Sequence, residues 1–335
     1  MQHEPHLGLP ARRLFAAAAA VIGTLIALVG VEIVARAAGY TPRGPLSKPE
    51  PPIHAPDPLL GWRPLPGSYQ FGPYSPDAGP VEVTILPDGS RDTGAGLPLG
   101  RKEVWLVGDS FTMGWAVADN ETFAWRLQEL RPDLHVSNFG VGGYGTLQSL
   151  IVLEELFASD RPRPQWVIYG FIDHAWRNVA APYWLWALSF NRHSVATPFA
   201  MLALDGGAQR HAPEAYPSLP LHEKLASVAL LENALMRWRA AGREQMGGPV
   251  TKALLSEMAA LCHANGAGFS AVVLTMPPQV AKTYARYGRN NGVDILACNQ
   301  RLRAEDIVIG EVHPNGPAHR RWGDCIADAL AKRLF

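Results

Sequence analysis

The sequence predicts an α/β fold in which helices cover both faces of a parallel β-sheet, and three features support this prediction. Short apolar runs alternate with segments that carry apolar residues at helical spacing. The first run, 104–107, is apolar throughout, as expected of a strand buried on both faces. Several runs end in glycine or polar residues, where open α/β sheets bind ligands. The expected strands are 104–107, 135–139, 166–169, 269–274 and 293–296, and the expected helices are 122–130, 146–157 and 318–334.

Composition excludes some classes of function. The 335 residues include 30 basic and 30 acidic side chains, and this balance argues against an electrostatic nucleic-acid binder. The three cysteines, Cys262, Cys298 and Cys325, form neither a CxxC pair nor a metal-ligand spacing, so we expect no metal site. Because the number of cysteines is odd, at least one thiol is free or paired with another chain. The sequence also allows one intrachain disulfide between the other two.

Residues 1–37 are expected to be a short polar tail followed by a transmembrane anchor. The stretch 14–31 carries no charge, and with the following residues it is long enough to cross a bilayer, which takes about 20 helical residues. The alternative is a cleaved signal peptide, because Ala35-Arg36-Ala37 loosely fits a small-x-small site. Signal peptides have shorter apolar cores, of about 7–15 residues, so we favour the anchor. Basic residues flank both ends, but a short N-terminal tail normally stays inside and would export the remainder.

The chain after the anchor divides into two expected parts. Residues 38–100 begin with many prolines and are expected to be a lead-in that packs on the main domain, with a strand at 81–86. Residues 101–335 are expected to form that domain, interrupted by a long insertion or cap at 174–250. The aromatic cluster of this insertion is expected to be packing rather than a substrate wall: Tyr183, Trp184 and Trp186.

Ser110 is the candidate nucleophile. It follows Gly108 and Asp109 directly after the first predicted strand, at the carboxyl edge of the sheet. A serine hydroxyl needs a base, an orienting acid and donors for the developing oxyanion. The alternative is a strand-to-helix turn in which the serine is only a helix cap.

Three further segments supply candidates for these parts. The glycine cluster 138–146 follows the second strand; it lacks the GK[ST] of a phosphate loop and suits an oxyanion donor. The segment 170–173 follows the third strand at the same edge of the sheet. His313, two residues after Glu311 and just before the last helix, is a candidate base with a candidate orienting acid.

In this order, the segments resemble the SGNH/GDSL hydrolase family, whose members cleave esters with a flavodoxin-like doubly wound sheet. The resemblance covers 101–335. Gly108-Asp109-Ser110-Phe111 looks like the nucleophile block, Asn138 to Gly143 looks like the glycine block with Gly143 as oxyanion donor, and His313 looks like the base. The apolar N-terminus and proline-rich lead-in resemble those of membrane-anchored bacterial members.

Two positions depart from the family pattern. Ile172 stands where the family has its oxyanion asparagine, so one donor is missing unless Asn178 or His174 replaces it. The family's aspartate three residues before the histidine is Gly310 here. Glu311 is the nearest acid, and Asp306 is the other candidate.

Together these features lead us to expect a serine ester hydrolase with Ser110, His313 and Glu311 as catalytic residues and Gly143 in the oxyanion hole. The substrate would be a small-molecule or carbohydrate ester, with an O-acyl group of an envelope carbohydrate as one candidate. The resemblance implies no cofactor and places a single-pass protein in a bacterial inner membrane, with its catalytic domain in the periplasm or outside the cell. The alternatives are an O-acyltransferase that uses the same residues and an inactive envelope binding or assembly protein.

Overall fold

The computed structural model describes residues 9–44, 53–75, 79–97, 100–191 and 195–334. The chain divides into two compact units. One comprises residues 1–46 and 216–239, and the other comprises residues 47–215 and 240–335.

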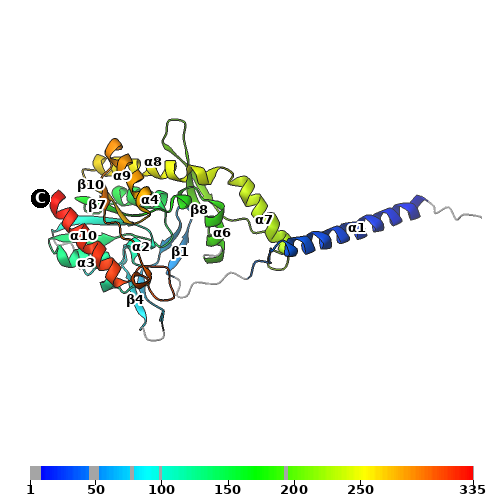
Figure 1. Ribbon diagram of the computed structural model, residues 1–335, viewed down its shortest axis with the longest axis horizontal. Helices are drawn as coiled ribbons and strands as arrows, with labels where there is room; N and C mark the ends of the chain where they lie inside the picture. The colour runs from blue at the N-terminus through cyan, green and yellow to red at the C-terminus, as the bar shows by residue number, and fades with distance from the viewer. Residues whose placement is uncertain (1–8, 45–52, 76–78, 98–99, 192–194, 335) are drawn as a thin grey trace, which may run out of the picture. The chain divides into compact units, whose positions relative to one another are not determined.

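A five-stranded parallel sheet is the centre of the larger unit (Figure 1). Its strand order is β11-β10-β7-β5-β6. Read from β6 and numbered by position in the chain, the five strands follow the order 2-1-3-4-5, which is the flavodoxin-like arrangement. The predicted fold class is confirmed, and each expected strand is present with ends shifted by a few residues. The strands are β5 (Lys102–Gly108), β6 (Leu134–Asn138), β7 (Trp166–Ile172), β10 (Gly268–Thr275) and β11 (Ile295–Ala297).

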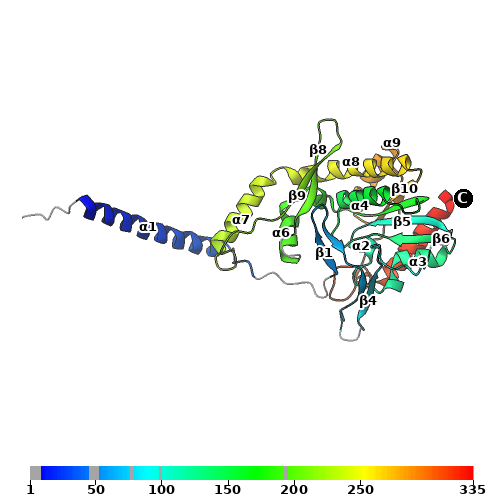
Figure 2. The same ribbon diagram turned by 180° about the vertical axis from the view of Figure 1, so that it is seen from behind.

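Helices cover both faces of this sheet, as Figure 2 shows from behind. On one face, α3 (Phe123–Leu130) and α10 (Gly316–Leu334) pack over Val104 and Leu106 of β5. On the other face, Trp105 and Val107 lie in the apolar core beneath α4 (Thr146–Ala158), α8 (Arg243–Ala264) and α9 (Pro278–Asn291). Successive residues of a strand point to opposite faces, so burial on both sides explains why this run has no polar alternation.

The register places three strand ends side by side. Gly108 of β5 pairs with Gly170 of β7, and Leu106 pairs with Asn138 of β6. The chain order reverses between β5 and β7, and such a switch point is where open α/β sheets form their ligand crevice. The short helix α2 (Ser110–Met113) begins there.

The lead-in forms two antiparallel hairpins and then covers the edge of the sheet. The hairpins are β1 (His54–Asp57) with β2 (Gly61–Pro64) and β3 (Gly67–Phe71) with β4 (Val81–Ile85). Arg91 N then donates to Asn138 O at 2.8 Å, and Thr93 Oγ1 donates to Val136 O at 2.7 Å. Both acceptors lie on β6, so its outer edge is closed to pairing with another strand.

The segment after β7 contains several elements. In the larger unit these are α5 (Ala175–Asn178), α6 (Pro182–Asn191) and a hairpin of β8 (Thr197–Leu202) and β9 (Ala208–Glu214). Residue 250, the expected end of the insertion, lies inside α8, a helix that packs on the sheet.

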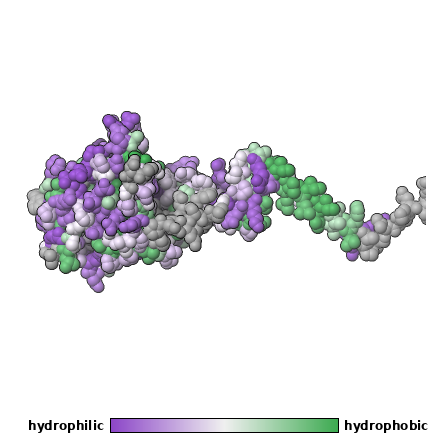
Figure 3. All heavy atoms as spheres, turned by 90° about the horizontal axis from the view of Figure 1, so that it is seen from below, coloured by the Kyte–Doolittle hydropathy of each residue, from purple (hydrophilic) through white to green (hydrophobic). Residues whose placement is uncertain are grey.

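The smaller unit joins α1 (Leu9–Ala37) to α7 (Ala226–Arg239). Glu32 of α1 accepts hydrogen bonds from Ala226 N and Ser227 N, both at 2.9 Å, and so caps the first turn of α7. The surface of α1 is apolar along most of its length (Figure 3). The helix is long and apolar enough to cross a membrane, although a signal sequence passes the same test.

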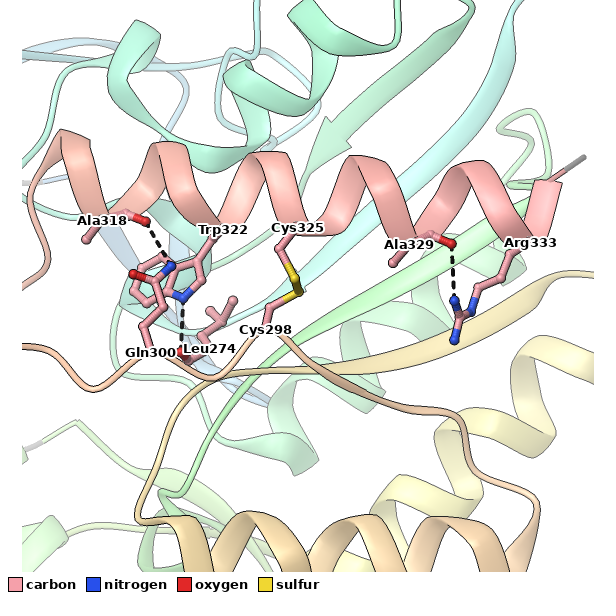
Figure 4. The surroundings of a disulfide bond; sticks show 8 residues. All are labelled: Leu274, Cys298, Gln300, Ala318, Trp322, Cys325, Ala329 and Arg333. Carbon is pink, nitrogen blue, oxygen red and sulfur yellow. Dashed lines mark hydrogen bonds between the residues drawn. A yellow bond between two sulfur atoms is a disulfide. The ribbon is translucent and has the colours of Figure 1, made fainter.

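One disulfide joins Cys298 to Cys325 of α10, and Cys262 is a buried free thiol (Figure 4). Next to the disulfide, Trp322 Nε1 donates to Leu274 O of β10 at 2.9 Å. These two links fix α10 against the sheet. A disulfide together with an apolar N-terminal helix is typical of a secreted or membrane-anchored extracytoplasmic protein.

Candidate active site

Ser110 lies at the sharp turn between β5 and α2. Asp109 caps this turn, because its Oδ1 accepts from Phe111 N at 2.9 Å. Gly108 has φ +154°, and a Cβ there would lie 2.2 Å from Thr112 Oγ1 and 2.9 Å from Gly170 O. The turn therefore requires glycine before the Asp-Ser pair.

The structure brings His313 and Glu311 to Ser110. Ser110 Oγ lies 3.1 Å from His313 Nε2, and His313 Nδ1 lies 2.9 Å from Glu311 Oε2. A carboxylate only accepts, so Nδ1 donates to Glu311, and Nε2 is left to accept from the serine hydroxyl. The hydrogen bond from His313 lowers the pKa of Glu311, against the opposing effect of partial burial.

Asp306, the other candidate acid, has different partners. Its side chain accepts from Arg321 Nη2 at 2.5 Å and from Arg303 N at 3.0 Å. Its carbonyl oxygen accepts from Asn315 N, which helps to hold the segment that carries His313. Asp306 thus supports this segment, while Glu311 contacts the imidazole.

The glycine cluster lies against the nucleophile turn. Asn138 Nδ2 donates to Thr112 O at 2.9 Å, and Val141 N donates to Gly108 O at 3.0 Å. Gly143 has φ +88°, which favours glycine. Among the described residues, neither Ser110 N–H nor Gly143 N–H has an acceptor. Both donors are therefore free to bind an oxyanion.

The position of the missing asparagine is apolar. Ile172 is buried in the core between the sheet and the α3 and α10 layer. Asn178 does not replace the donor, because its Nδ2 donates to Thr146 Oγ1 and Thr251 Oγ1 and its Oδ1 accepts from Leu147 N. His174 lies nearer, with Nε2 3.6 Å from Asp109 Oδ2. Burial lowers the pKa of His174 to about 2, so its ring is neutral.

Two buried arginines support the site, and the sequence analysis missed both. Arg177 Nη1 lies 3.4 Å from Asp109 Oδ2 and donates to Tyr144 O at 2.9 Å. Burial lowers the pKa of Arg177 to about 10 and raises that of Asp109. Arg91 donates to the carbonyls of Met113, Gly114 and Val117, just after the nucleophile turn. A lone arginine gives no sequence signal for such a role.

A second cluster of similar composition lies at the amino ends of β5 and β6. His135 Nδ1 is 3.0 Å from Glu103 Oε1 and 3.5 Å from Ser137 Oγ, and Nε2 is 3.0 Å from Gly96 O. The cluster lines a cavity of about 700 Å³ together with the segment 86–97. Within the described residues, no group of three or more His, Cys, Asp or Glu side chains could hold a metal ion.

Comparison with known proteins gives fold likenesses alone. No family model and no curated protein matches the chain. Similar solved structures include psychrotrophic esterase EstA from Pseudoalteromonas sp., at 12% identity over 70% of this chain and 98% of that chain, with a TM-score of 0.41. Another is Est24, a carbohydrate acetylesterase from Sinorhizobium meliloti, at 14% identity over 70% and 100%, with a TM-score of 0.39. A member of the lipolytic protein G-D-S-L family from Veillonella parvula DSM 2008 gives 12% over 69% and 100%, also with a TM-score of 0.39.

At such scores these likenesses carry no argument about this chain. The chain's own geometry defines a class: a flavodoxin-like α/β protein with serine, histidine and glutamate hydrogen-bonded in series at the switch point of its sheet.

Proposed function

We propose that this protein is a serine ester hydrolase of the SGNH/GDSL type, with its catalytic domain at 101–335. The observation that supports this most directly is the series of hydrogen bonds from Ser110 through His313 to Glu311, at 3.1 and 2.9 Å. This series supplies a nucleophile, a base and an orienting carboxylate in the arrangement that acyl transfer requires.

In the first half of the reaction, Ser110 Oγ attacks the acyl carbon while His313 Nε2 takes its proton. The negative charge that develops on the carbonyl oxygen accepts hydrogen bonds from Ser110 N–H and Gly143 N–H. Glu311 stabilises the imidazolium that has formed. The imidazolium proton then passes to the leaving alcohol, and the acyl group stays on Ser110 as an ester.

In the second half, water takes the place of the alcohol. His313 Nε2 accepts a proton from the water as its oxygen attacks the acyl-serine. The proton returns to Ser110 Oγ when the carboxylic acid leaves. The substrate we favour is an O-acyl group on an envelope carbohydrate. The acyltransferase alternative is tested by adding an unacylated glycan to the assay, because a transferase would convert this glycan into an acylated second product.

Labelling with a fluorescent organophosphonate tests the nucleophile directly. We expect the full-length protein in detergent to form a covalent adduct at Ser110, located by mass spectrometry. Ser137→Ala should label like the wild type, and Ser110→Ala should not label. A folded wild-type protein that does not react would support the inactive binding or assembly protein instead.

We further propose that α1 is an uncleaved single span in a bacterial inner membrane and that the unit with the catalytic domain lies outside the cytoplasm. The disulfide between Cys298 and Cys325 supports an oxidising location. A phosphatase fused after Phe335 should be active in cells, and mass analysis of the mature protein should retain α1. An inactive phosphatase would reverse the topology, and a mature chain without α1 would indicate a signal peptide.

A further inference from the structure

A series of aromatic rings extends from the nucleophile turn over the surface of α5 and α6. His174, 3.6 Å from Asp109, has its ring centroid 5.0 Å from that of Trp176. The Trp176 ring is in turn 5.9 Å from Tyr183, and Tyr183 is 6.2 Å from Trp186. The series thus begins at the residue that precedes Ser110 and leads away from it.

The outer rings of this series are exposed. The exposed fraction is 64% for Tyr183 and 42% for Trp186, so the packing role expected from the sequence is wrong for these two residues and holds for Trp184, which is buried. The two outer residues are three positions apart on one helix, so they share a face of α6. Their planes differ by 27°, so the two exposed rings present nearly parallel faces. Exposed aromatic surface of this kind contributes little to the core and is typical of a binding site.

The inner ring of the series is held rigidly. Trp176 packs against Trp184 at 5.1 Å, and the Arg177 guanidinium lies 5.1 Å from Trp176 and 4.9 Å from Trp184. The same guanidinium contacts Asp109. A rigid aromatic surface loses little conformational entropy when a ligand binds. Arg177 thereby links the inner ring of the series to the residue that precedes Ser110.

We propose that Trp176, Tyr183 and Trp186, called here the aromatic platform, bind sugar rings, so that the substrate is an O-acylated oligosaccharide or polysaccharide. This proposal rests on the proposed ester chemistry of Ser110. Sugar rings present flat faces of C–H groups that stack on aromatic rings, while their hydroxyls project from the edge. Half-buried polar groups of Asp173 and His174 lie beside the inner end of the platform and suit such hydroxyls. A long acyl chain would instead need an enclosed apolar pocket.

Turnover of two esters separates the platform from the catalytic residues. The substrates are O-acetylated xylohexaose and p-nitrophenyl acetate, which has no sugar ring to stack on the platform. We expect Tyr183→Ala and Trp186→Ala each to lower kcat/KM for the hexasaccharide about five- to tenfold, which corresponds to about 1–1.4 kcal/mol for each lost aromatic contact. Both variants should keep p-nitrophenyl acetate turnover within about twofold of the wild type. Trp238→Ala, which removes a tryptophan that is 76% exposed on α7, is the matched control and should change neither.

A binding measurement keeps the test independent of catalysis. Calorimetry with the Ser110→Ala protein and unacetylated xylohexaose needs no turnover, so it remains informative if the ester chemistry fails. We expect binding that weakens at least about fivefold when Tyr183→Ala or Trp186→Ala is added. Absence of hexasaccharide binding, or equal binding by all variants, would contradict the proposal that the aromatic platform binds sugars. Brominated lipid could instead quench the fluorescence of the wild type but not that of Trp186→Phe. This result would show that the surface contacts the bilayer and would also contradict the proposal.

Discussion

In the described part of the larger unit, serine, histidine and glutamate side chains meet around His313 and around His135. The two clusters differ in which ring nitrogen faces which partner. At His313, Ser110 and Glu311 face opposite nitrogens, Nε2 and Nδ1. At His135, Ser137 and Glu103 both face Nδ1, and Nε2 faces the Gly96 carbonyl. The first arrangement is the one that the proposed reaction requires, with the serine proton passing to one ring nitrogen and the carboxylate stabilising the resulting charge at the other.

The second cluster favours the charged form of its histidine. A carbonyl and a carboxylate both accept, and only the charged ring can donate to both of them from its two nitrogens. The hydrogen bond to Glu103 accordingly raises the pKa of His135 above its ordinary value, against the effect of burial. Partners that stabilise the protonated ring make it a poorer acceptor for a serine proton. Residue types within reach of one another therefore do not define a triad, and the order of the hydrogen bonds does.

Replacing the two serines should give the largest difference. Ser110→Ala should lower p-nitrophenyl acetate turnover at least about 10³-fold, because no other group takes the nucleophile's place. Ser137→Ala should stay within about twofold of the wild type. Initial rates at equal concentrations of folded protein, checked by circular dichroism, measure both. Comparable losses of turnover in the two variants would show that the two clusters do not differ in their catalytic role.

The two glutamates should differ next. Glu311→Gln should lower kcat about 10²- to 10⁴-fold, because an amide does not stabilise the imidazolium that forms at His313. Glu103→Gln should lower the melting temperature and leave kcat unchanged. Asp306→Asn is a second control, since Asp306 contacts Arg303 and Arg321 rather than the imidazole. If Asp306→Asn were the variant that lost activity, the orienting acid would have to be reassigned.

The disulfide should stabilise one cluster more than the other. Cys298 and Cys325 are 27 positions apart and enclose Glu311 and His313, whereas His135 lies on a strand. The Cys298→Ser/Cys325→Ser protein should lose about 3 kcal/mol of unfolding free energy, as loops of this length do. We expect esterase activity to be lost on heating before tryptophan fluorescence reports global unfolding. Coincident midpoints at the wild-type temperature would show that the disulfide does not support the site.

The smallest expected effect is on the pH dependence of stability. Because the folded pKa of His135 is raised above 6.5, its contribution is complete below that pH and is lost as the pH rises through the folded value. His135→Gln should therefore lower the melting temperature more at pH 6 than at pH 9. Scanning calorimetry of both proteins over this range gives the comparison. An equal difference at all pH values would mean that His135 is neutral in the folded protein.

The sheet could be predicted because its strands are buried on both faces and its helices have a clear period. The first strand ends at Gly108, the glycine that breaks the apolar run, and the helix expected at 146 begins at Thr146, directly after the glycine cluster. The site was harder to predict, because its parts meet only through the fold. Ser110, Glu311 and His313 could be proposed from their sequence context, but Arg91 and Arg177 could not. Their function depends on burial beside carbonyls and a carboxylate that are distant in sequence.

The distance in sequence between Ser110 and His313 has a consequence for when the protein can act. The two residues are 203 positions apart, so the site forms only after β5 has paired within the sheet and α10 has packed against it. Contacts with such long loops form late in folding, because the entropy of loop closure must first be overcome. A partly synthesised or unfolded chain therefore lacks the proposed catalytic site, so the proposed activity requires the folded domain.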